Sequence, residues 1–287
     1  MVMTDENMRC LSVVVPAYNE EATLSGVVQK LLMLPDLLEV VIVDDCSTDR
    51  TPEIAEGLAA VNSQVKFSRH EKNAGKTEAL KTGFAMTRGE IVIVQDADLE
   101  YDPNEIPAVI KPILEGHADV VYGSRFLVRK ATRVLYFYHY LANKVLTASS
   151  NMLTNLNMTD VETGYKAFRG EIIRNMIIKS RGFGFEIEVT AKVAKLGCAI
   201  YEVPISYYGR TYEEGKKIGV RDGLQAFWLV FRFNLFCGLR SSFRQVPQIG
   251  RMGATSQDVA QQSTPGENAN ENLKLTVAND SSALPGA

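Results

Sequence analysis

The 287-residue sequence has few of the side chains that build thiolate or imidazole metal centres. Its four cysteines, Cys10, Cys46, Cys198 and Cys237, lie far apart and form no CxxC pair. This spacing argues against a zinc or redox centre and fits a reducing compartment. The three histidines are equally scattered, so we expect no histidine metal site. The formal net charge of −3 excludes a generally basic nucleic-acid-binding protein, and we predict no nucleic-acid partner.

Long apolar runs are also missing. No segment offers the roughly 20 uninterrupted apolar residues that a membrane-spanning helix needs. The best candidate, GLQAFWLVF, is interrupted by Arg232. The polar first ten residues lack the apolar centre of a signal peptide. We therefore expect a cytoplasmic protein without a membrane span of its own.

Between Leu11 and about Ser206, short apolar runs alternate with segments of helical spacing. Five runs rich in Val and Ile read as buried strands: LSVVV (11–15), EVVIV (39–43), QVKFS (64–68), EIVIV (90–94) and DVVYG (119–123). Alternation of this kind predicts an α/β fold with a single, mostly parallel sheet flanked by helices. Ligands of such sheets bind at the carboxyl ends of the strands, where Asp45 and Asp96 should meet.

The end of the chain has a different composition. From about Phe243 onward it is rich in Gln, Asn, Ser, Gly and Pro and poor in aromatic residues. Such a composition is typical of disorder. We predict one domain over residues 1–240 and a disordered tail over residues 241–287.

The segment NAGKT, from Asn73 to Thr77, looks like the end of a phosphate-binding loop. The full motif needs a glycine five residues before Gly75, where this chain has His70. That glycine makes the tight turn that cups the phosphate. We therefore interpret NAGKT as the start of a helix.

An acid-rich run, IVIVQDADLEYDP, begins as a strand and continues into four carboxylates within seven residues. Crowded carboxylates repel one another, so a positive charge is expected among them. Asp96 and Asp98 can both face one crevice as hard oxygen ligands for Mg²⁺ or Mn²⁺. The alternative is a solvated turn with helix-capping acids. For Asp102, which precedes Pro103, we favour the cap.

Two further motifs stand before this run: VVVPAYNEE and VIVDDCSTDRT, each of which ends a predicted strand. Together with DAD, in this order and spacing, they resemble family 2 glycosyltransferases, which have the GT-A fold. The closer resemblance is to dolichol-phosphate mannosyltransferases and bacterial polyprenyl-phosphate glycosyltransferases. It continues through GSR, DVETGYKAF and RTYEEGK and covers roughly residues 9 to 240.

The resemblance implies roles for individual residues. The nucleotide-sugar site would comprise Pro16, Tyr18, Glu20, Val43, Asp45, Asp96, Ala97, Asp98, Arg125, Arg210 and Lys216. The catalytic residues would be Asp96, Asp98, Arg125 and Arg210. A Mg²⁺ or Mn²⁺ ion would be held by Asp96, Asp98 and Glu100. The acceptor side would include Asp160, Glu162 and Arg133. A divalent ion with two cations would stabilise the departing nucleoside diphosphate.

The stretch from Arg125 to Thr159 contains basic and aromatic residues but no acidic one. Its helical spacing favours an amphipathic helix at a membrane surface, and LQAFWLVFRFNLF could form a second one beside it. The alternatives are a helix packed on the sheet and a dimer surface. Relatives often carry transmembrane helices, which this sequence lacks, so a membrane-embedded partner protein is a further expectation.

We therefore predict an inverting, metal-dependent glycosyltransferase, peripheral to the inner face of a membrane. It would transfer a sugar from a UDP- or GDP-linked donor to a polyprenyl or dolichyl phosphate. Two alternatives stay open: transfer to a hydroxyl of a glycan or glycolipid, and a non-catalytic subunit that binds nucleotide sugars. The complete set of DAD, Arg210 and Lys216 argues against the subunit.

Overall fold

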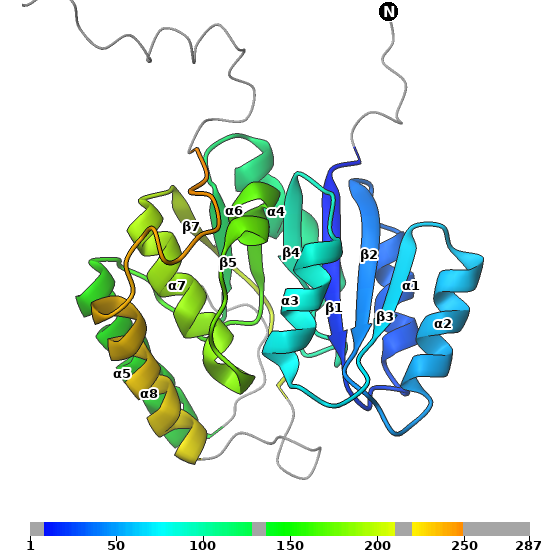
Figure 1. The fold of residues 1–287 in the computed structure, drawn as a ribbon, viewed down its shortest axis with the longest axis horizontal. Helices are drawn as coiled ribbons and strands as arrows, with labels where there is room; N and C mark the ends of the chain where they lie inside the picture. Colours follow the sequence, from blue (N-terminus) through cyan, green and yellow to red (C-terminus); the bar gives the residue numbers. More distant parts are fainter. Residues whose placement is uncertain (1–8, 128–135, 210–219, 249–287) are drawn as a thin grey trace, which may run out of the picture. The chain divides into compact units, whose positions relative to one another are not determined.

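The computed structural model describes residues 9–127, 136–209 and 220–248. Seven strands form one sheet in the order β3-β2-β1-β4-β6-β5-β7 (Figure 1). The strands are β1 (Leu11–Ala17), β2 (Leu37–Asp44), β3 (Val65–Arg69), β4 (Ile91–Val94), β5 (Val120–Ser124), β6 (Lys166–Arg169) and β7 (Ile200–Pro204). Only β6 runs antiparallel to its neighbours, β4 and β5. The predicted α/β class with a mostly parallel sheet is confirmed.

Helices cover both faces of this sheet. As a result, every residue of the central strand β4 is buried. The helices are α1 (Leu24–Leu32), α2 (Thr51–Val61), α3 (Lys76–Met86), α4 (Ile106–Leu114), α5 (Phe137–Thr154), α6 (Gly170–Asn175), α7 (Phe185–Leu196) and α8 (Val220–Leu235). Two short 3-10 helices, η2 (Pro103–Glu105) and η3 (Gly182–Gly184), precede α4 and α7. The five strands predicted from apolar runs coincide with β1 to β5.

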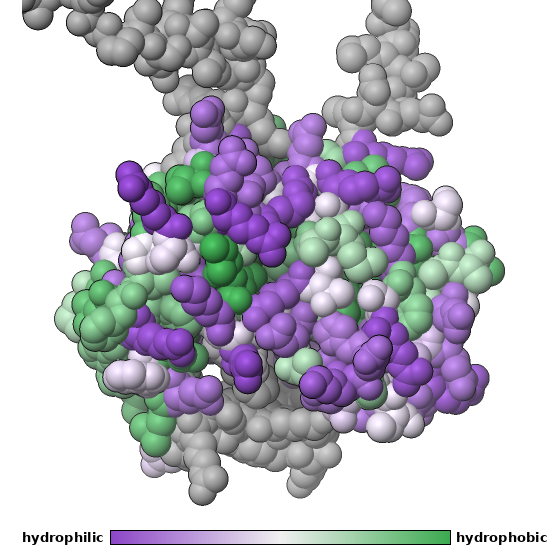
Figure 2. All heavy atoms as spheres, viewed as in Figure 1, coloured by the Kyte–Doolittle hydropathy of each residue, from purple (hydrophilic) through white to green (hydrophobic). Residues whose placement is uncertain are grey.

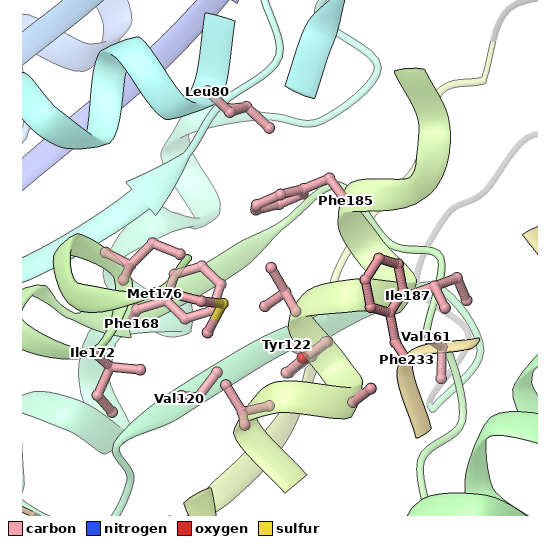
Figure 3. Packing of buried hydrophobic residues seen from close by; sticks show 14 of the residues in the cluster. Leu80, Val120, Tyr122, Val161, Phe168, Ile172, Met176, Phe185, Ile187 and Phe233 are labelled. Carbon is pink, nitrogen blue, oxygen red and sulfur yellow. The ribbon is translucent and has the colours of Figure 1, made fainter. Parts of the chain in front are cut away.

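A large apolar cluster joins the sheet to the helices of one face. Leu80 of α3, Phe185 and Ile187 of α7 and Phe233 of α8 pack with Val120 of β5 (Figure 3). A buried aromatic side chain of this kind contributes about 1.5–3 kcal/mol to stability. The cluster packs α7 against the face of the sheet formed by β4, β6 and β5.

The packed part of the chain extends past the predicted boundary at residue 240. Phe243 is only 3% exposed and belongs to the apolar cluster. The backbone N–H of Ile177 donates to the carbonyl of Ser242 at 2.8 Å, and that of Arg244 donates to the carbonyl of Asn175 at 2.8 Å. One aromatic residue in a polar run is a weak sequence signal, which is why composition alone placed this boundary too early. Residues 249–287 lie outside the described residues.

Helices α5 and α8 lie side by side against α7, away from the central strands (Figure 1). Both expose large apolar side chains, and Figure 2 shows green, hydrophobic residues gathered on this side of the molecule. None of the helices within the described ranges is long and apolar enough to cross a membrane.

Candidate active site

The acid-rich segment after β4 has its positive charge supplied by the chain itself. The ammonium of Lys76 lies 2.7 Å from Oδ1 and 2.9 Å from Oδ2 of Asp96. Asp98 Oδ1 accepts a hydrogen bond from the backbone N–H of Glu100 at 3.1 Å. Asp102 accepts from the backbone N–H of Asn104 at 3.2 Å and caps η2, as its sequence position predicts.

Lys76 is the first residue of α3, so NAGKT does begin a helix. The residue before it, Gly75, has φ +92°, a conformation that favours glycine. Its N–H donates to Asp45 Oδ2 at 2.6 Å, and the N–H of Ala74 donates to Asp45 Oδ1 at 3.0 Å. Gly75 binds Asp45, which follows β2, and the adjacent Lys76 binds Asp96, which follows β4. The start of α3 therefore connects the two carboxylates. The sequence analysis predicted the helix but did not predict that Lys76 pairs with Asp96. The Gly75-Lys76 pair at the start of the helix was the available signal.

The ammonium of Lys76 is held between two carboxylates. Glu186, at the start of α7, places its Oε1 3.8 Å from the Lys76 Nζ atom. Burial lowers the pKa of Lys76, but the charges of Asp96 and Glu186 outweigh this and raise that pKa above its ordinary value. Lys76 thus stays cationic at neutral pH. No sequence pattern links Glu186 to this site, because α7 reaches it only through tertiary packing.

The predicted base and ribose residues lie at the ends of β1 and β2, where Pro16 pairs in register with Val43. Tyr18 is 39% exposed beside them. The following loops are tied together, because the Glu20 N–H donates to Thr51 Oγ1 at 2.8 Å. A depression of about 330 Å³ opens beside Asp45, whose Oδ1 is bound by the His70 ring at 2.7 Å. It is lined by Cys46, Arg69, His70 and Glu71.

The predicted acceptor side contains a buried ion pair. Arg125 Nε lies 2.6 Å from Asp160 Oδ2, and its Nη2 lies 2.8 Å from Oδ1. Asp160 is fully buried; burial raises its pKa, but the Arg125 charge outweighs burial and lowers it. Asp160 is therefore ionised at neutral pH and a poor general base. The phenol of Tyr207 stacks under the same guanidinium, with 5.1 Å from its carbon to the ring centroid.

The loop that carries Asp160 also touches the predicted donor side. A Cβ atom on Gly164 would lie 2.8 Å from Asp96 Oδ2 and 2.9 Å from the Tyr101 ring. The Gly164 N–H donates to the Tyr101 hydroxyl at 2.9 Å. Any side chain at this position would displace the Asp96 carboxylate, so the glycine allows the two halves of the site to meet.

Glu162 is a buried carboxyl whose Oε1 has no hydrogen-bond partner in the described structure. It faces Glu186 from α7, Lys166 from β6, and the Arg125–Asp160 pair. Burial, followed by the Glu186 charge, raises the pKa of Glu162 to about 8. Burial likewise lowers the pKa of Lys166 to about 8, although its ammonium donates to the carbonyl of Val161 at 3.0 Å.

These shifts predict an unusual dependence of stability on pH. Between 4.5 and about 8 the folded protein keeps a proton on Glu162 that the unfolded chain releases, so the free energy of unfolding falls as pH rises. Above about 8, Lys166 has the opposite effect up to 10.5, because there the unfolded chain binds the extra proton. Glu162→Gln should remove the fall, which we expect to be on the order of 2–4 kcal/mol.

Chemical denaturation at a series of pH values measures this fall directly. Glu115→Gln, on the exposed end of α4, is the matched control and should follow the unsubstituted protein. If the unsubstituted protein and Glu162→Gln lose stability in parallel between pH 5 and 8, Glu162 is ionised in the fold and the assignment is wrong.

The proposed metal ligands form an incomplete set on their own. Within the described ranges, no group of three or more His, Cys, Asp or Glu side chains is placed to hold a metal ion. Glu100 Oε2 accepts from the Tyr207 hydroxyl at 2.9 Å. Mg²⁺ commonly binds to one or two carboxylates and completes its shell with substrate phosphates and water. The oxygen donors of Asp96 and Asp98 fit an ion that arrives with a diphosphate.

Several predicted site residues cannot be placed. Arg133 of the acceptor side and Arg210 and Lys216 of the donor side lie outside the described residues. Ala97 is buried between the two aspartates, as its small size allows. The described structure thus joins the DAD segment, Asp45, Arg125 and the Asp160 loop at one edge of the sheet.

Comparisons with known proteins identify the family. Residues 12–177 match the family model described as glycosyl transferase family 2. The undecaprenyl-phosphate mannosyltransferase of Micrococcus luteus is 31% identical over 79% of this chain and 99% of its own length. The polyprenol monophosphomannose synthase of Mycolicibacterium smegmatis is 28% identical over 72% and 80%. The dolichol-phosphate mannosyltransferase of Pyrococcus furiosus is 31% identical over 73% of this chain and 59% of its own.

Solved structures support the fold. Glucosyl-3-phosphoglycerate synthase from Mycobacterium tuberculosis, in complex with phosphoglyceric acid, superposes with a TM-score of 0.62 at 24% identity over 80% of this chain and 81% of its own. The same enzyme was also crystallised with Mn²⁺ and UDP-glucose, and that structure matches with a TM-score of 0.61 at 23% identity over 80% of each chain. At this identity the likeness establishes the GT-A fold alone.

Proposed function

This chain belongs to glycosyl transferase family 2, and from that membership we propose that it transfers a sugar from a UDP- or GDP-linked donor to a polyprenyl phosphate. It is a glycosyltransferase, and its relatives' names specify polyprenyl, undecaprenyl or dolichol phosphate as acceptor. In the proposed reaction, a phosphate oxygen of the acceptor bonds to the anomeric carbon as the bond to the nucleoside diphosphate breaks. Attack from the opposite side inverts the anomeric centre.

The observation that carries this proposal is the Arg125–Asp160 pair. A hydroxyl acceptor must lose its proton to a general base, whereas a phosphate is already anionic at neutral pH. Because Asp160 is fully buried in a two-point ion pair, it is unsuited to accept that proton. Arg125 keeps N–H donors beyond those used for Asp160, and they can bind an acceptor phosphate.

The donor side would combine the chain's own cations with a divalent ion. Asp96 and Asp98 would hold Mg²⁺ or Mn²⁺, which would neutralise the charge of the leaving diphosphate. Lys76 adds a fixed cation beside Asp96. Arg210 and Lys216 are assigned to the diphosphate by their match to the family motif. Support for a divalent ion comes from the neighbouring structure that contains Mn²⁺ and UDP-glucose.

Transfer to a hydroxyl remains the second candidate, and Glu162 favours it. An ionised Glu162 is suited to accept a proton from a hydroxyl, and with a pKa of about 8 it gains that form as the pH rises through 8. Glu162→Gln separates the candidates: turnover should persist with a phosphate acceptor and disappear with a hydroxyl acceptor.

A two-step screen tests the proposal. Native mass spectrometry of the protein with a panel of UDP- and GDP-sugars, with and without Mn²⁺, identifies the donor. Turnover of that donor is then followed with and without a lipid extract. We expect binding of one nucleotide sugar and nucleoside diphosphate release that depends on the extract. Release that is independent of lipid would contradict a lipid acceptor.

We also propose that α5 and α8 rest on the inner surface of a membrane. Phe137 and Tyr138 of α5 and Trp228 of α8 are 67%, 79% and 60% exposed. Large exposed apolar side chains on paired helices, next to a basic stretch, suit an anionic bilayer surface. Arg129, Lys130 and Arg133 would add electrostatic attraction by sequence position.

Liposome sedimentation tests this surface. The double variant Phe137→Ser with Trp228→Ser should lower the partition coefficient between liposomes and water by roughly tenfold or more. Burial of each of these side chains in the membrane contributes on the order of 1.5–3 kcal/mol of binding free energy. Met33→Ser with Val61→Ser, which removes exposed apolar residues from α1 and α2, is the matched control. Salt should weaken binding to anionic liposomes. Equal sedimentation of both double variants would assign the surface to another contact.

A further inference from the structure

The strongest feature that the proposed reaction leaves unused is the ammonium of Lys144, on α5. Its Nζ donates to the carbonyl of Thr159 at 3.3 Å and lies 4.6 Å from the Phe126 ring centroid and 5.6 Å from that of Tyr140. An ammonium has three N–H donors, and one carbonyl satisfies only one of them. Among the described residues, no carboxylate forms an ion pair with Lys144.

Lys144 shares the Phe126 ring with the catalytic candidate Arg125, whose guanidinium carbon lies 5.5 Å from the same centroid. The two cations differ in charge balance, because Asp160 neutralises Arg125. Glu202 of β7 approaches the same loop, but it accepts the N–H groups of Thr159 and Asp160. Within the described ranges, Lys144 is therefore a cation at this end of the site that has no direct carboxylate partner.

Large apolar side chains precede Lys144 on its own helix, α5. Phe137, Tyr140 and Leu141 precede it at helical spacings of seven, four and three residues, and all are exposed. An anionic head that reached Lys144 could leave a long apolar chain along this side of α5. The aromatic rings also reduce the contact of the ammonium with water, which strengthens its attraction to an anion.

We propose that Lys144, framed by Phe126 and Tyr140, binds the phosphate monoester of the lipid acceptor beside Arg125. This inference rests on the proposed function and adds a binding residue to it. The ligand is a phosphate joined to a long apolar chain. The phosphodiester heads of bulk anionic phospholipids carry similar chemistry and are the competing source.

The test is steady-state kinetics in neutral detergent micelles, where polyprenyl phosphate is the only anionic lipid. Lys144→Gln should raise KM for polyprenyl phosphate about tenfold, the scale of one charge-assisted hydrogen bond, and leave KM for the nucleotide sugar unchanged. Lys144→Arg should stay within about threefold of the unsubstituted protein, because it keeps the charge. Lys111→Gln, on the exposed face of α4, is the control.

Three results would overturn the inference. The first is an unchanged acceptor KM in Lys144→Gln. The second is an equal rise of both KM values, which indicates a structural role of the contact with Thr159. The third is a loss of binding to acceptor-free phosphatidylglycerol vesicles as large as the rise in acceptor KM, which assigns Lys144 to bulk headgroups. If no polyprenyl phosphate is glycosylated, the proposed function fails. Calorimetry with farnesyl phosphate then still tests the inference about Lys144: equal affinity of the unsubstituted protein and of Lys144→Gln overturns it.

Discussion

Asp98→Asn is expected to lower turnover by about 10³-fold or more, the scale of losing a preorganised charge partner at a reacting diphosphate. An amide keeps the size of the side chain, and its oxygen can still accept the Glu100 N–H that Asp98 accepts at 3.1 Å. It cannot replace the negative charge that a divalent ion needs. The melting temperature should therefore stay within a few degrees, and chelation by EDTA should abolish turnover of the unsubstituted enzyme.

The matched control is Asp102→Asn, in the same acid-rich run. Asp102 caps η2 and lies 3.4 Å from Lys30, an exposed pair worth at most about 1 kcal/mol. Because asparagine is also a good cap, this variant should keep nearly full activity. Measurement of kcat with saturating donor and Mn²⁺ compares the two variants. Full activity of Asp98→Asn, or of the unsubstituted enzyme in EDTA, would sink the assignment of the metal to Asp98.

Arg125→Ala is expected to lower both stability and turnover. Removal of the guanidinium leaves the fully buried Asp160 carboxylate without its partner, which should cost about 3–5 kcal/mol of unfolding free energy. Turnover should fall by about 10²-fold, because the acceptor phosphate loses its charge-assisted donors. Urea denaturation and initial rates below the melting temperature measure the two losses separately.

A double-mutant cycle separates folding from catalysis. Arg125→Ala with Asp160→Asn removes the unpaired charge, so it should regain about 2 kcal/mol of stability. It should not regain turnover, since the phosphate-binding donors are still missing. If activity returns together with stability, Arg125 serves the fold alone and another group binds the acceptor.

Local patterns in the sequence were sufficient for β1 to β5, but not for β6 or for β7, which runs parallel to β5. The strands β1, β2, β4 and β5 are Val- and Ile-rich runs because both of their faces are buried, and such runs are visible without any partner. β6 and β7 carry charged residues such as Lys166 and Glu202, which are acceptable only because other elements supply their partners. The antiparallel β6 therefore had no sequence signal of its own.

In the site, too, some features follow from local sequence patterns and others only from the folded chain. The DAD segment and Asp45 follow predictable strands, so their common edge follows from topology. The Lys76–Asp96 and Arg125–Asp160 pairs join residues 20 and 35 positions apart, and only the folded chain brings them together. The prediction of a positive charge among the carboxylates was sound, but it pointed to a metal alone and overlooked the nearby lysine. Lys144 belongs to the basic stretch from Arg125 to Thr159, but the sequence did not single it out, because its contacts with Thr159 and Phe126 form only in the folded chain.

The most direct test of the central claim offers the enzyme two acceptors that differ only in their head group. Polyprenyl phosphate and polyprenol of equal chain length are incubated with the radiolabelled donor identified by the screen, with Mn²⁺ or with EDTA. The proposed function predicts labelled lipid from the phosphate only, with loss of labelling in EDTA. Labelling of polyprenol at a comparable rate, with no preference for the phosphate, would contradict it.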